Sequence, residues 1–163
     1  MRSLHDVLVI GFSILIALML SIVPLPDWGK WFVPEWAAMV LIFWAMTTPR
    51  RIGVGVAWCV GLLVDVLDGL LLGETALAMT VTVYIAARFY KQIRVFPLLQ
   101  QGLVVFLLIL VYQVIIYLIQ GMIGELPQTW TYWLPALLSM ALWPWLCIVL
   151  RDYSKRFGLI KER

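Results

Sequence analysis

Two aspartates lie deep in an apolar stretch of this sequence. They are the residues whose presence there most needs a chemical explanation. Asp65 and Asp68 fall within the run GLLVDVLDGLLLG, which begins at Gly61 and ends at Gly73. An aspartate at the centre of a membrane helix costs about 2.5–3.5 kcal/mol on the insertion scale, whereas each Leu, Ile or Val returns only about 0.3–0.6 kcal/mol. Carboxylates held at that cost catalyse a reaction, bind a ligand, or satisfy polar groups of neighbouring helices.

We do not expect this pair to be catalytic. Asp65-x-x-Asp68-Gly69 resembles the opening of the CDP-alcohol phosphotransferase motif D-x-x-D-G-x-x-A-R, but Leu72 and Gly73 replace its alanine and arginine. No later D-x-x-x-D supplies further carboxylates for Mg²⁺. An intramembrane aspartyl protease needs carboxylates from two helices that share a proton, and these two come from one. With no other catalytic motif, one histidine and two cysteines, we expect no enzyme, no cofactor and no metal site.

The composition indicates an integral membrane protein. The chain has 163 residues, of which 64% are hydrophobic and 13% charged, and its mean hydropathy is +0.99. Soluble domains are roughly 45–50% apolar and about 25% charged. A membrane helix needs about 20 apolar residues. We therefore predict an all-α membrane protein with a single domain over residues 1–163. Its six transmembrane helices are expected at about 7–23, 31–48, 52–72, 75–90, 98–120 and 130–150.

The basic residues orient these six helices. Every Lys and Arg except Lys30 falls on the side that holds both termini. The opposite side carries the acids Asp27, Glu35, Glu74 and Glu125. An excess of Lys and Arg marks the cytoplasmic side, so both termini are predicted to be cytoplasmic. The net charge of +3 then reflects orientation, and no nucleic-acid partner is expected. Some of these residues can also contact anionic membrane lipid or a cytoplasmic partner. The candidates are Arg50, Arg51, Arg151, Lys155 and Arg156.

Helical spacing places the two aspartates on one face together with small residues. Gly61, Asp65, Asp68, Gly69 and Leu72 share a stripe at i, i+4, i+7, i+8 and i+11. Glycines on such a stripe let another helix approach closely, and a proline within a helix offers a kinked surface. The candidate residues for helix packing or a partner face are Gly61, Gly69, Gly73 and Pro144.

The depth of Asp65 predicts a polar layer within the bundle. If the helix continues to Gly73, Asp65 lies about 12 Å from its outer end, at about 1.5 Å per residue. A similar distance along the other helices reaches Thr82, Gln113 and Ser139. We predict a buried polar layer of these four residues, with Asp68 nearer the outer surface. Its members either satisfy one another and hold the bundle together, or line a cavity or a partner groove.

Four short segments, in this order, resemble the rod shape-determining protein MreD family over nearly the whole chain. They are Pro24-Leu25-Pro26-Asp27, Pro49-Arg50-Arg51-Ile52, Gly61-x-x-x-Asp65-x-x-x-Gly69-x-x-x-Gly73 and Leu142-Trp143-Pro144-Trp145. The resemblance implies a bacterial inner-membrane protein of the cell-elongation machinery. It also implies that the protein acts together with MreC, the MreB filament, RodA and a class B penicillin-binding transpeptidase. The implied fold is similar to the small substrate-binding subunits of vitamin transporters, and no enzymatic activity is implied.

Two functions therefore remain open. In the first, the protein is a scaffold whose helix bundle binds MreC and helps position peptidoglycan synthesis. In the second, it is a membrane transport subunit whose polar layer around Asp65 binds a small ligand or lipid. A scaffold needs only that the polar groups are satisfied, whereas a ligand-binding subunit needs them hydrated and reachable from one side.

Overall fold

The computed structural model describes residues 2–29, 32–69, 71–125 and 127–158, and within these ranges the chain is helical and has no strand. The prediction of an all-helical protein is confirmed. The helices are α1 (Arg2–Ile22), α2 (Trp36–Thr47), α3 (Val54–Asp68), α4 (Glu74–Arg88), α5 (Tyr90–Val95), α6 (Leu98–Ile123), the 3-10 helix η2 (Trp130–Trp133) and α7 (Leu134–Arg156).

The short helix α2 is the centre of the molecule. Its residues from Ala37 to Met46 are all buried, and it contacts α1, α4, α5, α6 and α7. Because α2 is apolar on every side, it has no face suited to water and packs as a buried core helix. Trp44 anchors it, since its indole N–H donates a 2.8 Å hydrogen bond to the Ser13 hydroxyl of α1.

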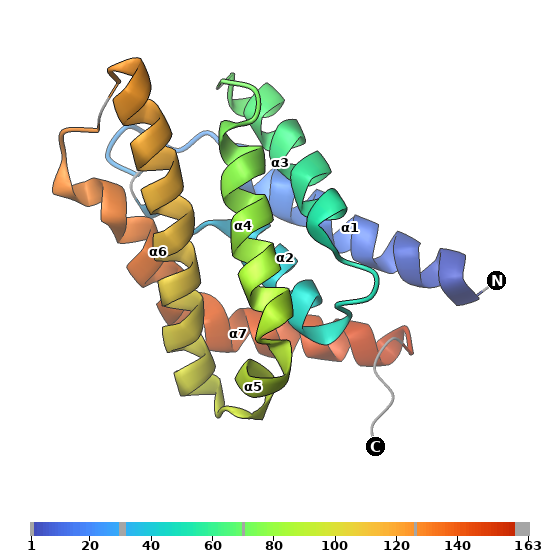
Figure 1. Cartoon of the computed structure of the whole chain (residues 1–163). Helices are drawn as coiled ribbons and strands as arrows, with labels where there is room; N and C mark the ends of the chain where they lie inside the picture. Colours follow the sequence, from blue (N-terminus) through green and yellow to red (C-terminus); the bar gives the residue numbers. More distant parts are fainter. Residues whose placement is uncertain (1, 30–31, 70, 126, 159–163) are drawn as a thin grey trace.

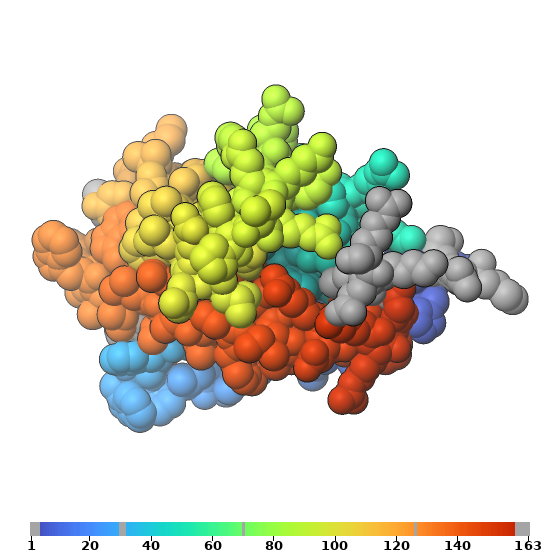
Figure 2. All heavy atoms as spheres, turned by 90° about the horizontal axis from the view of Figure 1, so that it is seen from below, coloured from blue at the N-terminus to red at the C-terminus, as the bar shows by residue number. Residues whose placement is uncertain are grey.

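Two groups of helices surround α2. Helices α3, α4 and α6 stand side by side, and α1 and α7 lie behind them (Figure 1). Seen from below, α7 extends across α4 and α6 rather than along them (Figure 2). The tightest pairing is the α3–α4 hairpin, where Gly61 lies directly against Ala76: a Cβ atom at Gly61 would overlap the Ala76 backbone.

Three helical segments among the described residues are long and apolar enough to cross a membrane. They are Leu4–Ile22, Leu98–Ile123 and Trp130–Arg156, and α2 is a shorter apolar helix. Helices α3 and α4 have 15 residues each. Length and composition thus support three of the predicted spans by themselves, while the other predicted spans coincide with shorter helices.

Several helix boundaries differ from the predicted ones for local reasons. Helix α2 begins at Trp36 rather than near residue 31, since the chain first passes through Pro34. Helix α3 ends at Asp68 rather than at residue 72, because Gly69 adopts a left-handed φ of 66° and terminates it. Helix α7 continues through Pro144 to Arg156, beyond the predicted end at residue 150. The six-residue helix α5 was not predicted.

Candidate functional site

Asp65 acts as a cap for the start of α4. Its side chain is completely buried. One carboxylate oxygen accepts hydrogen bonds from the backbone N–H groups of Gly73 at 2.8 Å and Ala76 at 3.4 Å, and the other accepts one from Thr75 at 2.9 Å. The first N–H groups of a helix have no partner within the helix, and the helix dipole favours a negative charge there. The surroundings of Asp65 therefore stabilise its charge.

This placement changes the predicted depth of Asp65. The estimate assumed a continuous helix up to Gly73, but the chain reverses at Gly69, which lies outside α3. Asp65 consequently lies one turn from the end of α3 and beside the first turn of α4, near Thr75. Thr82 lies two turns further along α4, and its hydroxyl donates to the Ala78 carbonyl of the same helix at 2.8 Å.

Gln113 and Ser139 also bind groups outside the predicted layer. The Gln113 amide donates to the Tyr132 carbonyl at 3.1 Å, and the Tyr132 hydroxyl donates back to the Gln113 carbonyl at 2.9 Å. The Ser139 hydroxyl accepts a 3.2 Å hydrogen bond from the Glu35 N–H. Like Asp65 and Thr82, both are buried. Among the described residues, none of the four predicted layer residues forms a hydrogen bond with another of them, so they are not one network.

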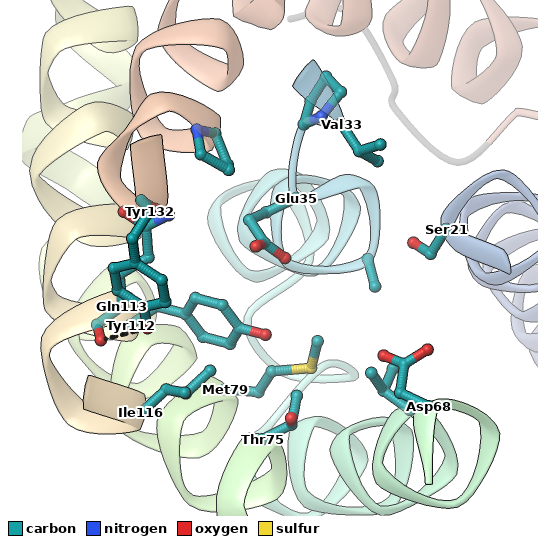
Figure 3. A pocket seen from close by; sticks show the side chains of 14 residues that line it. Ser21, Val33, Glu35, Asp68, Thr75, Met79, Tyr112, Gln113, Ile116 and Tyr132 are labelled. Carbon is teal, nitrogen blue, oxygen red and sulfur yellow. Dashed lines mark hydrogen bonds between the residues drawn. The ribbon is translucent and has the colours of Figure 1, made fainter. Parts of the chain in front are cut away.

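A cavity of about 300 Å³ lies at the end of the molecule predicted to face outward, and is called here the outer cavity. Its walls come from the end of α1, the loop before α2, the end of α3, the start of α4, the second half of α6, and the start of η2 and α7. Its polar lining consists of Ser21, Glu35, Asp68, Thr75, Tyr112, Gln113 and Tyr132. In Figure 3, Glu35, Asp68 and Tyr112 point into this space from different sides.

Three of the predicted layer residues support walls of this cavity. Asp65 holds the backbone of Thr75, Ser139 holds the backbone of Glu35, and Gln113 is joined twice to Tyr132. Thr75, Glu35 and Tyr132 then present their own atoms to the outer cavity. The side chains singled out by sequence thus lie mostly behind those that line the space, with Gln113 in both sets.

Glu35 is the acidic lining residue that the sequence did not single out as a site residue. It lies in the loop before α2, directly after Pro34. Burial, and next the neighbouring Asp68 carboxylate, raise the pKa of its carboxyl from 4.5 to about 7. The sequence offers one signal for it, an acidic residue between a proline and an apolar helix, and this signal alone places Glu35 only on the outer side.

The predicted packing glycines have two different roles. Gly61 makes the close approach to Ala76 in the α3–α4 hairpin. Gly69 and Gly73 do not form the predicted small-residue contact on a helix, because both lie in the turn between α3 and α4. There they adopt positive φ values of 66° and 102°, with open space where a Cβ would be. Pro144 lies within α7 and is half-buried.

The candidate basic residues lie at the opposite end from the outer cavity. Arg51, between α2 and α3, forms a 2.7 Å ion pair with Asp6 of α1. Arg50, Lys155 and Arg156 are exposed, and Arg151 is half-buried. The α2–α3 loop lies at the same end of the molecule as the start of α1 and the end of α7 (Figure 1).

The comparisons with known proteins agree with the resemblance noted in the sequence. Residues 1–153 match the family model described as rod shape-determining protein MreD. The chain is also 29% identical to the rod shape-determining protein MreD of Haemophilus influenzae over 144 residues. This alignment covers 88% of this chain and 89% of the relative. No solved structure matches the chain significantly. This family has a role in determining rod shape, and the apolar helices agree with a membrane protein. Because the family match covers most of its residues, the chain belongs to the MreD family of rod shape-determining proteins.

Proposed function

We propose that this protein is a non-enzymatic adaptor of the bacterial cell-elongation machinery in the inner membrane. It binds the membrane helix of MreC and thereby helps position peptidoglycan synthesis, together with the MreB filament, RodA and a class B penicillin-binding transpeptidase. Family membership supports the link to rod shape. The observation that carries the adaptor function is an apolar groove between α1 and α7 with a volume of about 190 Å³.

The groove offers a surface for a partner helix. Its floor includes Val40 of α2, and its walls include Ile16 and Leu20 of α1 and Trp145 and Val149 of α7. The four wall residues are all exposed large apolar side chains. Partner helices in a membrane associate through close packing, because lipid tails are as apolar as the helices themselves. A groove between two helices gives a partner more contact than a single convex face does.

Adjacent residues of α7 provide a matched test of the groove. Val149 lines it, whereas the neighbouring Ile148 is similarly exposed but does not. Val149→Trp should fill the groove and reduce co-purification of MreC at least about tenfold, since loss of about 1.4 kcal/mol has that effect. Ile148→Trp should leave it unchanged. Co-expression in mild detergent followed by native mass spectrometry gives the stoichiometry, and equal binding by both variants would show that the partner docks elsewhere.

We further propose that the chain crosses the inner membrane six times, with both termini in the cytoplasm. The α1–α2, α3–α4 and α6–η2 connections lie toward the opposite end from the start of α1 and the end of α7 (Figure 1). Trp28 lies in the α1–α2 connection and Trp130 is the first residue of η2, and both are exposed, as aromatic residues at a membrane interface are. Single cysteines in a background without Cys59 and Cys147 test this topology. Gln128→Cys should react in whole cells with an impermeant maleimide, and Gln92→Cys should react only after lysis.

The outer cavity favours a second candidate function, the binding of a small ligand. The resemblance to substrate-binding subunits of vitamin transporters belongs with this possibility. A scaffold needs no open space among its polar groups, whereas seven polar side chains border a cavity here. Asp65→Asn tests whether the charge of this supporting residue matters, because Asp65 holds the Thr75 backbone but does not itself line the cavity. If MreC binding and rod shape survive Asn but not Leu, the role of Asp65 is structural.

A further inference from the structure

We propose that the outer cavity binds the ammonium group of an organic amine, either a free small amine or an amine-bearing lipid headgroup. The groups that receive it are the carboxylates of Glu35 and Asp68 and the amide oxygen of Gln113. This inference rests on the second candidate function, ligand binding, and does not require the interaction with MreC.

The charge of the cavity selects a cation. Among the described residues, the two carboxylates of the lining, Glu35 and Asp68, have neither an ion pair nor a side-chain hydrogen bond, and no Lys, Arg or His lines the space. They come from different elements, the loop before α2 and the end of α3. Two facing carboxylates repel each other, and a positive guest between them removes that repulsion. An anionic ligand would increase it.

An unpartnered amide oxygen adds a requirement for hydrogen-bond donors. Gln113 lines the cavity and is only 2% exposed. Its amide nitrogen is occupied by the Tyr132 carbonyl, but its side-chain oxygen has no partner among the described residues. A buried acceptor left unsatisfied costs free energy. Because this oxygen has almost no accessible surface, it accepts from a guest only after the Gln113 side chain turns toward the cavity. An ammonium group with N–H donors then satisfies it, whereas a quaternary ammonium does not.

The size and walls of the cavity favour an organic cation over a metal ion. About 300 Å³ is the space of roughly ten water molecules at about 30 Å³ each, and it lies at the lower end of small-molecule sites. In the described part of the chain, no three His, Cys, Asp or Glu side chains are placed to hold a metal. Val64, Met79 and Ile116 supply apolar wall. The ligand is therefore an amine with a short apolar portion.

Thermal unfolding of the full chain tests the proposal without any partner. The purified protein in maltoside detergent at pH 8 is followed by the fluorescence of its nine tryptophans. n-Hexylamine should raise the midpoint temperature, whereas n-hexanol, of equal length but uncharged, and hexyltrimethylammonium, charged but without donors, should not. In the lipid arm, nanodiscs with phosphatidylethanolamine are compared with nanodiscs of phosphatidylcholine, whose headgroup lacks N–H donors.

The two arms distinguish the sources of the ammonium group. A response to hexylamine assigns the site to free amines, and a response only to phosphatidylethanolamine assigns it to the lipid headgroup. Both results support the proposal. Equal effects of hexylamine, hexanol and hexyltrimethylammonium, together with equal effects of the two lipids, would overturn it. Stabilisation by co-expressed MreC alone would also overturn it and assign these carboxylates to a protein partner.

Isosteric variants locate the effect. Glu35→Gln and Asp68→Asn should each weaken hexylamine binding. The hexylamine concentration that gives half of the maximal shift should rise at least about tenfold, since each variant removes a charge-assisted hydrogen bond. Asp152→Asn removes an exposed carboxylate at the opposite end of α7 and should leave the response unchanged. If the amine response persists in both cavity variants, the ammonium binds elsewhere and the assignment is wrong. The wild-type comparison of amine and alcohol remains decisive even if one variant fails to fold.

Discussion

Asp65 and Asp68 lie one helical turn apart on α3, yet their surroundings are opposite. Asp65 is completely buried and accepts three backbone hydrogen bonds at the start of α4. Asp68 is exposed at the edge of the outer cavity, where no described side chain forms an ion pair or hydrogen bond with it. Burial alone therefore does not indicate a functional carboxylate. The buried one is satisfied by the fold, and the open one is available to a ligand.

The comparison extends to the two regions that contain these residues. The α3–α4 hairpin is closed by an acid cap and by the contact of Gly61 with Ala76. The outer cavity is assembled from loops and helix ends contributed by most of the chain. The two regions share the end of α3 and the start of α4, which line the cavity, and Asp65 holds the backbone of Thr75 in that shared wall. The hairpin is thus a closely packed wall for a space that the remaining elements complete.

The largest expected effect comes from removing the Asp65 cap. Asp65→Leu leaves three N–H groups of the α4 start without an acceptor and should lower the free energy of unfolding by at least about 3 kcal/mol, since each buried orphan donor costs about 1–3 kcal/mol. Asp65→Asn, which keeps one acceptor oxygen, should lose about 1–2 kcal/mol. Thermal or denaturant unfolding in detergent measures both.

The matched control is Asp68→Asn, which should lower the free energy of unfolding by no more than about 0.5 kcal/mol, since exposed substitutions rarely cost more and this one also removes the repulsion between Asp68 and Glu35. Similar losses for the Asp65 and Asp68 variants would remove the distinction between the two aspartates.

The pH dependence of stability tests the cavity side of the comparison. The pKa of Glu35 is raised to about 7 from 4.5, so the folded state holds its proton more tightly than the unfolded state does. The contribution of Glu35 to stability is then fully present below pH 4.5 and is lost as the pH rises through about 7. Glu35→Gln should remove this loss and stabilise the protein at pH 8 by up to about 3 kcal/mol, with little effect at pH 4.

Midpoint temperatures in detergent at pH 4 and pH 8 measure this difference, with Asp152→Asn as the control carboxylate. A gain of the same size at both pH values would mean that the charge of Glu35 is not what costs stability.

Two glycines of α3 test the closeness of the hairpin. A methyl group at Gly61 meets the Ala76 backbone, whereas nothing lies within 4 Å of one at Gly55. Gly61→Ala should cost about 1–3 kcal/mol through overpacking. Gly55→Ala should be neutral or stabilise by up to about 1 kcal/mol, because alanine favours helix. Unfolding in detergent measures both, and the hairpin contact would be contradicted if both glycines tolerated alanine equally.

Much of the helical fold could be predicted from hydropathy and from the Gly and Pro residues that mark the ends of helices. The apolar runs predicted α1, α6 and α7, which contain the three segments of the described chain that are long and apolar enough to cross a membrane. The polar residues Asp65, Gln113 and Ser139 were recognised because polar groups in apolar runs are costly. Their positions within the runs identified them without any knowledge of their partners.

The connections between these residues could not be predicted from periodicity. A single positive φ at Gly69 ends α3 and moves Asp65 from the expected layer to the start of α4. Glu35 reaches the cavity through a loop, and its backbone partner Ser139 is 104 residues away in the chain. Helical periodicity predicts which residues share one face of a helix. It does not predict the path of a loop or which helix end a side chain contacts.

Asp6 is a third carboxylate, and it differs from both Asp65 and Asp68. It has a charged partner, but the pair is not deeply buried. Its 2.7 Å ion pair with Arg51 ties α1 to the α2–α3 loop, but the Arg51 side chain is 38% exposed. Exposed ion pairs are screened by water and salt, so Asp6→Asn should cost only about 0.2–1 kcal/mol. The loss should shrink further in 1 M NaCl, whereas the loss in Asp65→Leu should not depend on salt. Unfolding of both variants at low and high salt measures this contrast. Equal salt sensitivity would mean that solvent reaches the Asp65 cap, and the hairpin would then be an open structure like the cavity beside it.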